Sequence, residues 1–212
     1  MARGNTVIIF GQHNNILPDW CKGLAFAHTF LYSMSVLFSR EESILFVVFR
    51  ISLRNFISMI RVLFVCHGNI CRSPMAVFVL KHMDIQAGIS DQFFIASAAT
   101  STEEIGNPVY PPAKRMLAQH GISCEGKTAR QIRKSDYAQY DLIIGMDDAN
   151  MRNMRRAFGG DPENKLHLMM DYTNRKGSSV ADPWYTGDFQ ATWRDVNDGC
   201  RGLLLSLGFA SC

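Results

Sequence analysis

Beyond residue 60 the sequence alternates between short apolar runs and longer segments of helical pattern. The apolar runs have the length of buried strands and cover residues 61–66, 92–98, 142–146 and 166–170. The helical segments cover residues 73–83, 111–119, a stretch that begins at 148, and 188–207, and residues 171–186 are expected to form a loop. Because strands that alternate with helices pair in parallel, the sequence predicts an α/β fold. We expect a four-stranded parallel sheet, doubly wound and flanked by helices on both faces.

The composition is typical of a globular domain. The 212 residues are 47% hydrophobic and 19% charged, which excludes a disordered chain and supplies enough apolar side chains for a core. The net charge of +3 is too small to indicate a nucleic-acid partner. Six cysteines are too sparse for a small fold held together by disulfides. We therefore expect free thiols.

The first 58 residues differ from the rest of the chain. They contain seven of the 14 phenylalanines and two apolar runs, residues 24–38 and 43–53, both shorter than the roughly 20 residues that span a bilayer. Three interpretations stay open: sequence translated upstream of the true start, a membrane-surface anchor, or a structural extension. We favour the first, with Met59 as the initiator, because a predicted strand follows at once. The chain then divides into an atypical segment, 1–58, and a domain, 59–212, and membrane contact is expected only if the segment is genuine.

The residues after the first predicted strand have the pattern of an anion-binding loop. Residues 66–73 read CHGNICRS, in which an arginine follows a cysteine by six positions and a helix comes next. Such a loop directs backbone N–H groups inward, the helix N-terminus adds positive potential, and the same groups stabilise a Cys66 thiolate. Arg72 offers a planar fork to two phosphate oxygens. Ser73 can donate a hydrogen bond to the sulfur, and Gly68 permits a tight turn or a positive φ.

A second cysteine and arginine pair shows that the spacing alone does not indicate an anion-binding loop. Cys124 and Arg130 have the same spacing, but no apolar strand precedes Cys124 and a glutamine follows the arginine. We therefore interpret Cys124 as an ordinary thiol near a loop. Only the first pair has strand, glycine, asparagine, arginine, serine, proline and helix in that order.

Two segments of the sequence resemble those of a known family. Residues 65–74, VCHGNICRSP, resemble the signature loop of the low-molecular-weight protein tyrosine phosphatases, and residues 182–185, DPWY, resemble that family's Asp-Pro-aromatic-aromatic loop. The likeness covers about residues 60–208. It implies an enzyme that hydrolyses phosphotyrosine in protein substrates and needs neither a metal nor another cofactor. We expect a monomer or a weak homodimer.

The residue types in these two loops predict a mechanism. Cys66, as a thiolate, attacks phosphorus, while Arg72 and the loop amides stabilise the equatorial oxygens of the transition state. Asp182 protonates the leaving phenolate, and a phosphocysteine intermediate forms. Asp182 then acts as a general base on water, and Ser73 stabilises the departing thiolate. This thiolate chemistry requires a reducing compartment, so we expect a cytoplasmic location.

The resemblance implies further roles for residues around the loop. Asn69 holds the loop in its strained shape, and Ser97 helps it. Cys71 is a buried small side chain or a redox partner that pairs with Cys66 and protects it from over-oxidation, and we favour the redox partner.

Three more residues are expected to shape the substrate slot. Trp184 and Tyr185 are either core aromatics or the wall of a slot for a phenyl ring, and we favour the wall. The resemblance implies that arginine phosphatases place Thr where this chain has Ile70, whose apolar side chain suits a flat aryl ring. His67 is interpreted as a variable loop residue.

Three alternative functions stay open. The same fold serves arginine phosphatases and arsenate reductases, but the reductases need two neighbouring cysteines, whereas only Cys200 and Cys212 follow Cys124 here. The third alternative is a non-catalytic phosphate-binding module, which would need neither a nucleophile nor an acid. Two positions depart from the family pattern: Val77 replaces the usual Glu, and Lys127 replaces a His that supports the loop in some members.

Overall fold

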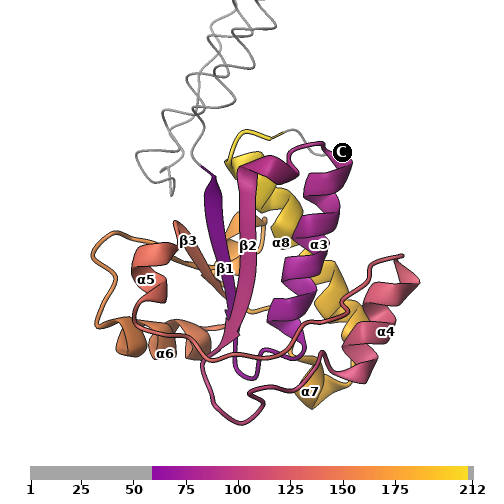
Figure 1. Ribbon diagram of the computed structural model, residues 1–212, viewed down its shortest axis with the longest axis horizontal. Coiled ribbons are helices and arrows are strands. Elements are labelled where there is room, and N and C mark those ends of the chain that lie inside the picture. Colours follow the sequence, from indigo (N-terminus) through magenta and orange to yellow (C-terminus); the bar gives the residue numbers. More distant parts are fainter. Residues whose placement is uncertain (1–58, 210–212) are drawn as a thin grey trace, which may run out of the picture.

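A four-stranded parallel sheet lies at the centre of the computed structural model, which describes residues 59–209 (Figure 1). Its strands are β1 (Ile60–Cys66), β2 (Phe93–Ala99), β3 (Leu142–Gly145) and β4 (Leu166–Leu168). They pair in the order β2-β1-β3-β4, and every pair is parallel. The predicted α/β fold class is therefore confirmed. The predictions made for residues 1–58 lie outside the described residues.

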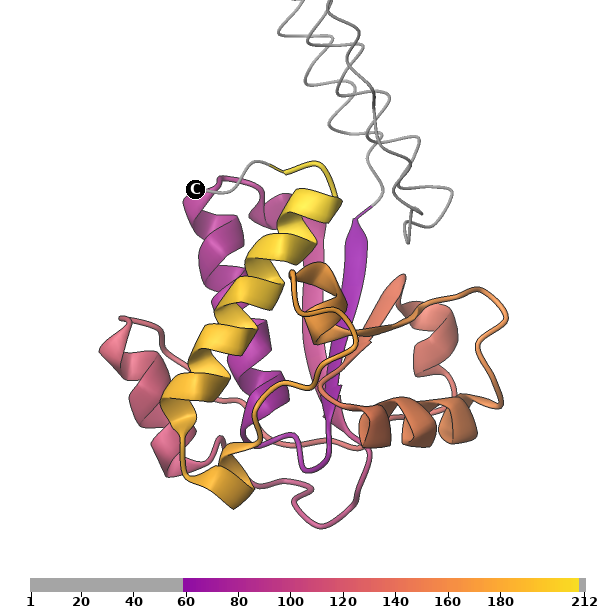
Figure 2. The same cartoon turned by 180° about the vertical axis from the view of Figure 1, so that it is seen from behind.

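Helices cover both faces of the sheet (Figures 1 and 2). One face carries α3 (Arg72–Gln86), α4 (Pro111–Gln119) and α8 (Phe189–Ser206). The other face carries α5 (Asp136–Gln139) and α6 (Asp148–Phe158). The short α7 (Pro183–Thr186) and two 3-10 turns, η2 (Ser90–Gln92) and η3 (Met169–Tyr172), complete the described chain. Within residues 59–209 no helix has both the length and the apolarity that crossing a membrane requires.

Alternate side chains of β1 enter two separate cores. Val62 and Phe64 pack into the core beneath α3 and α8, whereas Leu63 and Val65 pack into the core beneath α6. Because both faces are covered, β1 reads as an unbroken apolar run. The alternation places Cys66, the last residue of β1, on the α3 side.

The strand ends differ from the predicted ones by one or two residues. β2 begins and ends one residue later than predicted. β3 ends at Gly145, one residue early, because the Met146 N–H donates to Asn150 Oδ1 at 3.1 Å and the Met146 C=O accepts from Val180 at 2.8 Å. β4 ends at Leu168, two residues early, where the chain turns into η3.

The helices differ from the prediction mainly where they are short. α3 begins one residue earlier and ends three residues later than predicted. α5 was not predicted, and α7 lies inside the predicted loop 171–186. Both have four residues, which is too short to show a helical period in the sequence.

The packing of α8 depends on a glycine. A Cβ on Gly202 would lie 1.8 Å from the carbonyl oxygen of Tyr172 in η3. Only a residue without a side chain permits this approach. α8 is therefore fixed closely against the segment that leads from β4 toward α7.

Candidate active site

The loop between β1 and α3 curls around the Cys66 sulfur. Cys66 Sγ accepts a hydrogen bond from the Asn69 backbone N–H at 3.2 Å and lies 3.1 Å from Ser73 Oγ. Ser73 is fully buried in the first turn of α3, so the thiol meets the positive end of that helix. The structure thus brings together the predicted nucleophile, its loop and the predicted serine.

Asn69 is the residue that holds the loop. Its φ is 59°, in the left-handed region that asparagine tolerates better than most residues. Its Nδ2 donates to Ser73 Oγ at 2.8 Å, and its Oδ1 accepts from Lys127 Nζ at 2.8 Å and from the Arg130 N–H at 3.2 Å. Because Ser73 Oγ already accepts from Asn69, its own hydrogen is free to point at Cys66 Sγ.

Lys127, which the sequence marks as a departure from the family, lies in this network. Besides Asn69 Oδ1, its Nζ contacts the Thr128 carbonyl oxygen at 2.5 Å. Burial, with a smaller effect from Arg130, lowers the pKa of Lys127 to about 8. The other departure, Val77, is buried in the core of the α3 face, and the first turn of α3 contains no acidic residue.

The low pKa of Lys127 predicts a rise in stability at alkaline pH. The lysine is charged in both the folded and the unfolded state below about pH 8, and the fold bears the cost of holding that charge. Between that pH and the ordinary value of 10.5 the folded protein releases the proton first, so the free energy of unfolding increases with pH. We expect wild type to gain stability relative to Lys127→Met between about pH 7 and about pH 10, measured by urea unfolding. Lys134→Met, at an exposed position, serves as the control, and equal pH profiles for wild type and Lys127→Met would contradict the assignment.

Gly68 permits a close approach rather than an unusual backbone angle. The residue with positive φ in the loop is Asn69, so the sequence-based alternative of a positive φ at Gly68 is wrong. A Cβ on Gly68 would lie 3.1 Å from Glu104 Cγ, and the small residue lets Glu104 pack over the loop. The adjacent His67 is exposed, and its Nε2 lies 3.1 Å from Glu103 Oε2.

Arg72 is buried between two carboxylates. Its Nη1 donates to Asp147 Oδ2 at 2.6 Å, and its Nη2 contacts Asp182 Oδ2 at 2.5 Å. Burial disfavours the charge, but the neighbouring Cys66 and the two carboxylates outweigh burial and raise the pKa of Arg72 above its ordinary value. The guanidinium is thus held fully charged beside the thiol.

Asp147 is a site residue to which the sequence assigned no chemistry. It follows β3, and its Oδ1 caps α6 by accepting from the Asn150 N–H at 2.7 Å. β3 is the neighbour of β1, so the carboxyl ends of both strands lie at one edge of the sheet. That adjacency was the available signal, because ligands of parallel sheets bind at this edge.

Asp182 lies in the same site although it is far from Arg72 along the chain. It caps α7, its Oδ1 accepting from the Trp184 N–H at 3.1 Å while its Oδ2 meets Arg72. The side chains of Trp184 and Tyr185 are exposed rather than packed in the core. Tyr110 supports Trp184 with ring centroids 5.7 Å apart.

These groups line one cavity of about 300 Å³. Its lining combines the nucleophile, the loop, the arginine, the carboxylate, two acidic side chains and the two exposed aromatics: Cys66, His67, Gly68, Ile70, Cys71, Arg72, Glu103, Glu104, Asp182, Trp184 and Tyr185. Nine of the twelve site residues expected from the sequence line this cavity, and Asn69, Ser73 and Ser97 do not.

Three predicted residues have more specific environments. Ile70 and Cys71 are buried together against Ala129. Burial, reinforced by Cys66 and Asp182, raises the pKa of Cys71 to about 12, so Cys71 stays a neutral thiol. Ser97 is buried on β2, but within residues 59–209 its hydroxyl has no hydrogen-bond partner, so the structure offers no bond for its predicted support of the loop.

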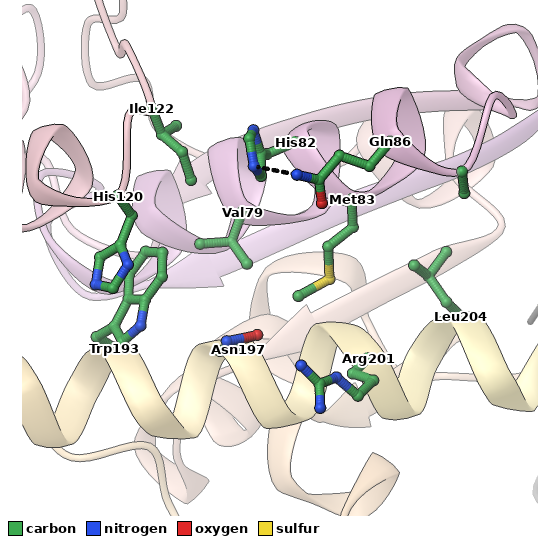
Figure 3. Close-up of a pocket in the computed structure, with 11 residues that line it drawn as sticks. Val79, His82, Met83, Gln86, His120, Ile122, Trp193, Asn197, Arg201 and Leu204 are labelled. Carbon is green, nitrogen blue, oxygen red and sulfur yellow. Dashed lines mark hydrogen bonds between the residues drawn. The ribbon is translucent and has the colours of Figure 1, made fainter. Parts of the chain in front are cut away.

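A second cavity, of about 210 Å³, lies between α3 and α8 (Figure 3). His120 stacks on Trp193 at its edge, with ring centroids 3.7 Å apart. His82 and Arg201 also line it, but none of the residues from the Cys66 loop does. The other cysteine with the Cys-x5-Arg spacing, Cys124, is buried outside both of these cavities, and burial raises its pKa.

The fold and this loop define a class of α/β proteins that bind a tetrahedral oxyanion at a helix N-terminus beside a cysteine. A family model for low molecular weight phosphotyrosine protein phosphatase matches residues 61–210. The chain belongs to this family, and the resemblance and enzyme class predicted from the sequence are confirmed.

Individual relatives agree with the family assignment. The chain is 36% identical over 150 residues to the low molecular weight protein-tyrosine-phosphatase YfkJ of Bacillus subtilis, covering 70% of this chain and 96% of the relative. It is 37% identical over 147 residues to the human low molecular weight phosphotyrosine protein phosphatase, covering 68% of this chain and 92% of the relative.

Solved structures share the fold. The crystal structure of YfkJ superposes with a TM-score of 0.69 over 71% of this chain and 96% of that chain. A drosophila arginine phosphatase, 30% identical, superposes with a TM-score of 0.62 over 68% of this chain and 95% of that chain. The fold thus serves proteins described by different phosphoryl substrates.

Proposed function

We propose that this protein hydrolyses phosphotyrosine in proteins through a phosphocysteine intermediate. One observation carries the proposal: Cys66 Sγ, held by a loop N–H and by Ser73, lines the same cavity as Arg72 and Asp182. A nucleophile, an oxyanion clamp and a proton donor are the groups that transfer of a phosphoryl group from a phenol requires.

In the first step the Cys66 thiolate forms a bond to phosphorus as the bond from phosphorus to the phenolic oxygen breaks. Arg72 and the loop N–H groups donate to the three equatorial oxygens, on which charge is spread in the transition state. The bound phosphate competes with Asp182 for Arg72 Nη2 and so releases the carboxyl group. A neighbouring dianion favours the neutral form of a carboxyl, and Asp182 gives its proton to the leaving oxygen.

In the second step water replaces the thiolate. Asp182, now a carboxylate, takes a proton from water as the new oxygen–phosphorus bond forms and the sulfur–phosphorus bond breaks. Ser73 stabilises the departing thiolate, because its hydroxyl accepts from Asn69 and its own hydrogen is free to be donated to Cys66 Sγ. Phosphate then leaves, and Arg72 returns to Asp182.

Cys71 fits the role of redox partner. Its thiol is neutral, buried and five residues from the nucleophile, and it lines the same cavity. A sulfenic acid on Cys66 can condense with this thiol to form a disulfide and release water, which prevents irreversible oxidation. A reductant then restores both thiols, which suits a cytoplasmic location. We propose that the protein is a monomer or a weak homodimer.

The lining favours an aryl phosphate over phosphoarginine. Trp184 and Tyr185 offer exposed aromatic faces, and Ile70 is an apolar residue among those that line the cavity. The likeness to an arginine phosphatase keeps that activity as the second candidate.

The acidic rim predicts a preference among phosphotyrosine sites. Glu103 and Glu104 line the cavity, and both carry negative charge near its mouth. We expect peptides with lysine or arginine beside the phosphotyrosine to be hydrolysed with a kcat/KM about 3 to 10 times that of peptides with glutamate there, at low salt. Glu104→Gln together with Glu103→Gln should reduce this ratio toward one. An unchanged ratio in the double variant would show that Glu103 and Glu104 do not cause the preference for basic peptides.

The test of the proposed function uses the full chain with chelator and reductant present. Phosphotyrosine peptide, phosphoserine peptide, phosphoarginine and arsenate are offered separately, and phosphate release or arsenite formation is measured. We expect phosphotyrosine to be the best substrate and an acid-quenched sample to contain phosphate bound to Cys66. Faster hydrolysis of phosphoarginine would favour the second candidate, and binding of phosphotyrosine without turnover would indicate a phosphate-binding module.

A further inference from the structure

We propose that Thr192 and Asp195 of α8 are positioning residues that hold Asp182 in reach of the leaving oxygen. This inference rests on the proposed function, in which Asp182 is the general acid. Neither residue touches the cavity that holds the reacting groups. They act through Ala181, the residue immediately before the acid.

Both backbone polar groups of Ala181 are bonded to α8. The Ala181 N–H donates to Asp195 Oδ2 at 2.9 Å, and the Thr192 hydroxyl donates to the Ala181 carbonyl oxygen at 2.8 Å. A carbonyl lies in the same plane as the following N–H, so fixing the Ala181 carbonyl also fixes the backbone nitrogen of Asp182. These two bonds therefore set the direction in which the acid leaves the chain.

Both side chains are buried, so their polar groups depend on these bonds in place of water. Thr192 is 0% exposed and Asp195 is 6% exposed. A buried carboxylate is costly unless its oxygens are paired, and the second oxygen of Asp195 accepts from Arg175 Nη2 at 2.6 Å. Asp195 is thus a charged anchor in a place where an apolar residue would pack at lower cost.

The segment around the acid has other supports beside these two bonds, because Tyr110 packs against Trp184 and Arg72 contacts the Asp182 carboxylate. α7, which Asp182 caps, has only four residues, and its aromatic side chains are exposed. Upstream, the Val180 N–H donates to the Met146 carbonyl oxygen at 2.8 Å. Residues 180 and 181 therefore join the acid to two rigid elements, the end of β3 and the side of α8.

The two residues occupy a side of α8 different from the one that faces α3. Trp193, Asn197 and Arg201 point into the cavity between α3 and α8 (Figure 3). Thr192 and Asp195 bond instead to the segment before α7. The same helix therefore carries the two proposed positioning residues and other side chains that do not bond to Ala181. A substitution at such a side chain can serve as a control.

Displacing a general acid has a kinetic signature that general damage lacks. Tyrosine is a poor leaving group because its phenol has a pKa of about 10, so its departure needs a proton. 2,4-Dinitrophenolate leaves without one. A variant that misplaces Asp182 should therefore lose kcat/KM for phosphotyrosine and keep kcat/KM for 2,4-dinitrophenyl phosphate, because kcat/KM reports the transfer of phosphate to Cys66. The value of kcat does not discriminate, because it also contains the later hydrolysis of the intermediate, in which Asp182 is the base for every ester.

The experiment compares kcat/KM for these two esters in the full chain. Thr192→Val and Asp195→Asn keep the shape of each side chain, and Asp182→Asn is the reference for complete loss of the acid. We expect Asp182→Asn to lower kcat/KM for phosphotyrosine by about 10² to 10⁴-fold. The combined Thr192→Val and Asp195→Asn variant should lower it about 10- to 100-fold, with kcat/KM for 2,4-dinitrophenyl phosphate within about twofold of wild type.

The matched control is Asp198→Asn. It makes the same chemical change one turn along α8, at a carboxylate that is 60% exposed and 3.8 Å from Arg175, and it should leave both rates unchanged. Equal loss on the two esters, or no loss on phosphotyrosine, would overturn the proposal. If the double variant does not fold, Thr192→Val alone must show the selective loss. Failure of wild type to hydrolyse either ester would instead overturn the proposed function.

Discussion

Replacing Cys66 by serine in the full chain is expected to lower kcat for p-nitrophenyl phosphate by at least about 10⁴-fold. The serine hydroxyl is a far weaker nucleophile, and no histidine lines the cavity except the exposed His67, which is paired with Glu103. The loop N–H groups and Arg72 remain, so binding of a phosphotyrosine peptide should persist. Stopped-assay kinetics and calorimetric binding of that peptide check the two halves of this expectation.

Cys124→Ser is the matched control for this experiment. Cys124 is also buried and also stands six residues before an arginine, but it lies outside the cavity of the Cys66 loop. Its kcat should stay within about twofold of wild type. Residual turnover of Cys66→Ser above about 1% of wild type would contradict the assignment of Cys66 as nucleophile.

The arrangement of the sheet was predictable because its strands are buried on both faces. β1 enters two cores with alternate side chains, so its sequence is apolar throughout and its length marks a strand. The prolines at its start and the glycine after its end likewise indicated α4. The end of β3 depends instead on a bond from Val180, which comes from a distant part of the chain. Local pattern does not contain that information.

The same distinction divides the site. Cys66, Asn69, Arg72 and Ser73 lie within eight consecutive residues, so their spacing alone indicates a loop around an anion. Asp147 lies 75 residues from its partner Arg72, and Lys127 lies 58 residues from Asn69. The strand order brings Asp147 to Arg72, and the loop between α4 and α5 brings Lys127 to Asn69.

Arg72→Lys is expected to lower kcat/KM for phosphotyrosine by about 10³-fold. Lysine keeps the positive charge but presents a single point, whereas the guanidinium offers two parallel N–H donors to the equatorial oxygens. In the structure the two ends of that fork already lie on different carboxylates, Nη1 on Asp147 and Nη2 on Asp182. Asp147 therefore orients the guanidinium while the other end turns between Asp182 and the substrate.

Comparison with Arg72→Ala separates geometry from charge. Arg72→Ala leaves Asp147 and Asp182 without their shared cation. The melting temperature of this variant should therefore fall further below that of wild type than the melting temperature of Arg72→Lys does. Inhibition by vanadate measures oxyanion binding directly, and both variants should bind vanadate more weakly than wild type. If Arg72→Lys retained kcat/KM within about tenfold, charge alone would explain catalysis at this position. The ion pairs of Arg72 with the two carboxylates would then stabilise the fold, and the planar shape of the guanidinium would not be needed for catalysis.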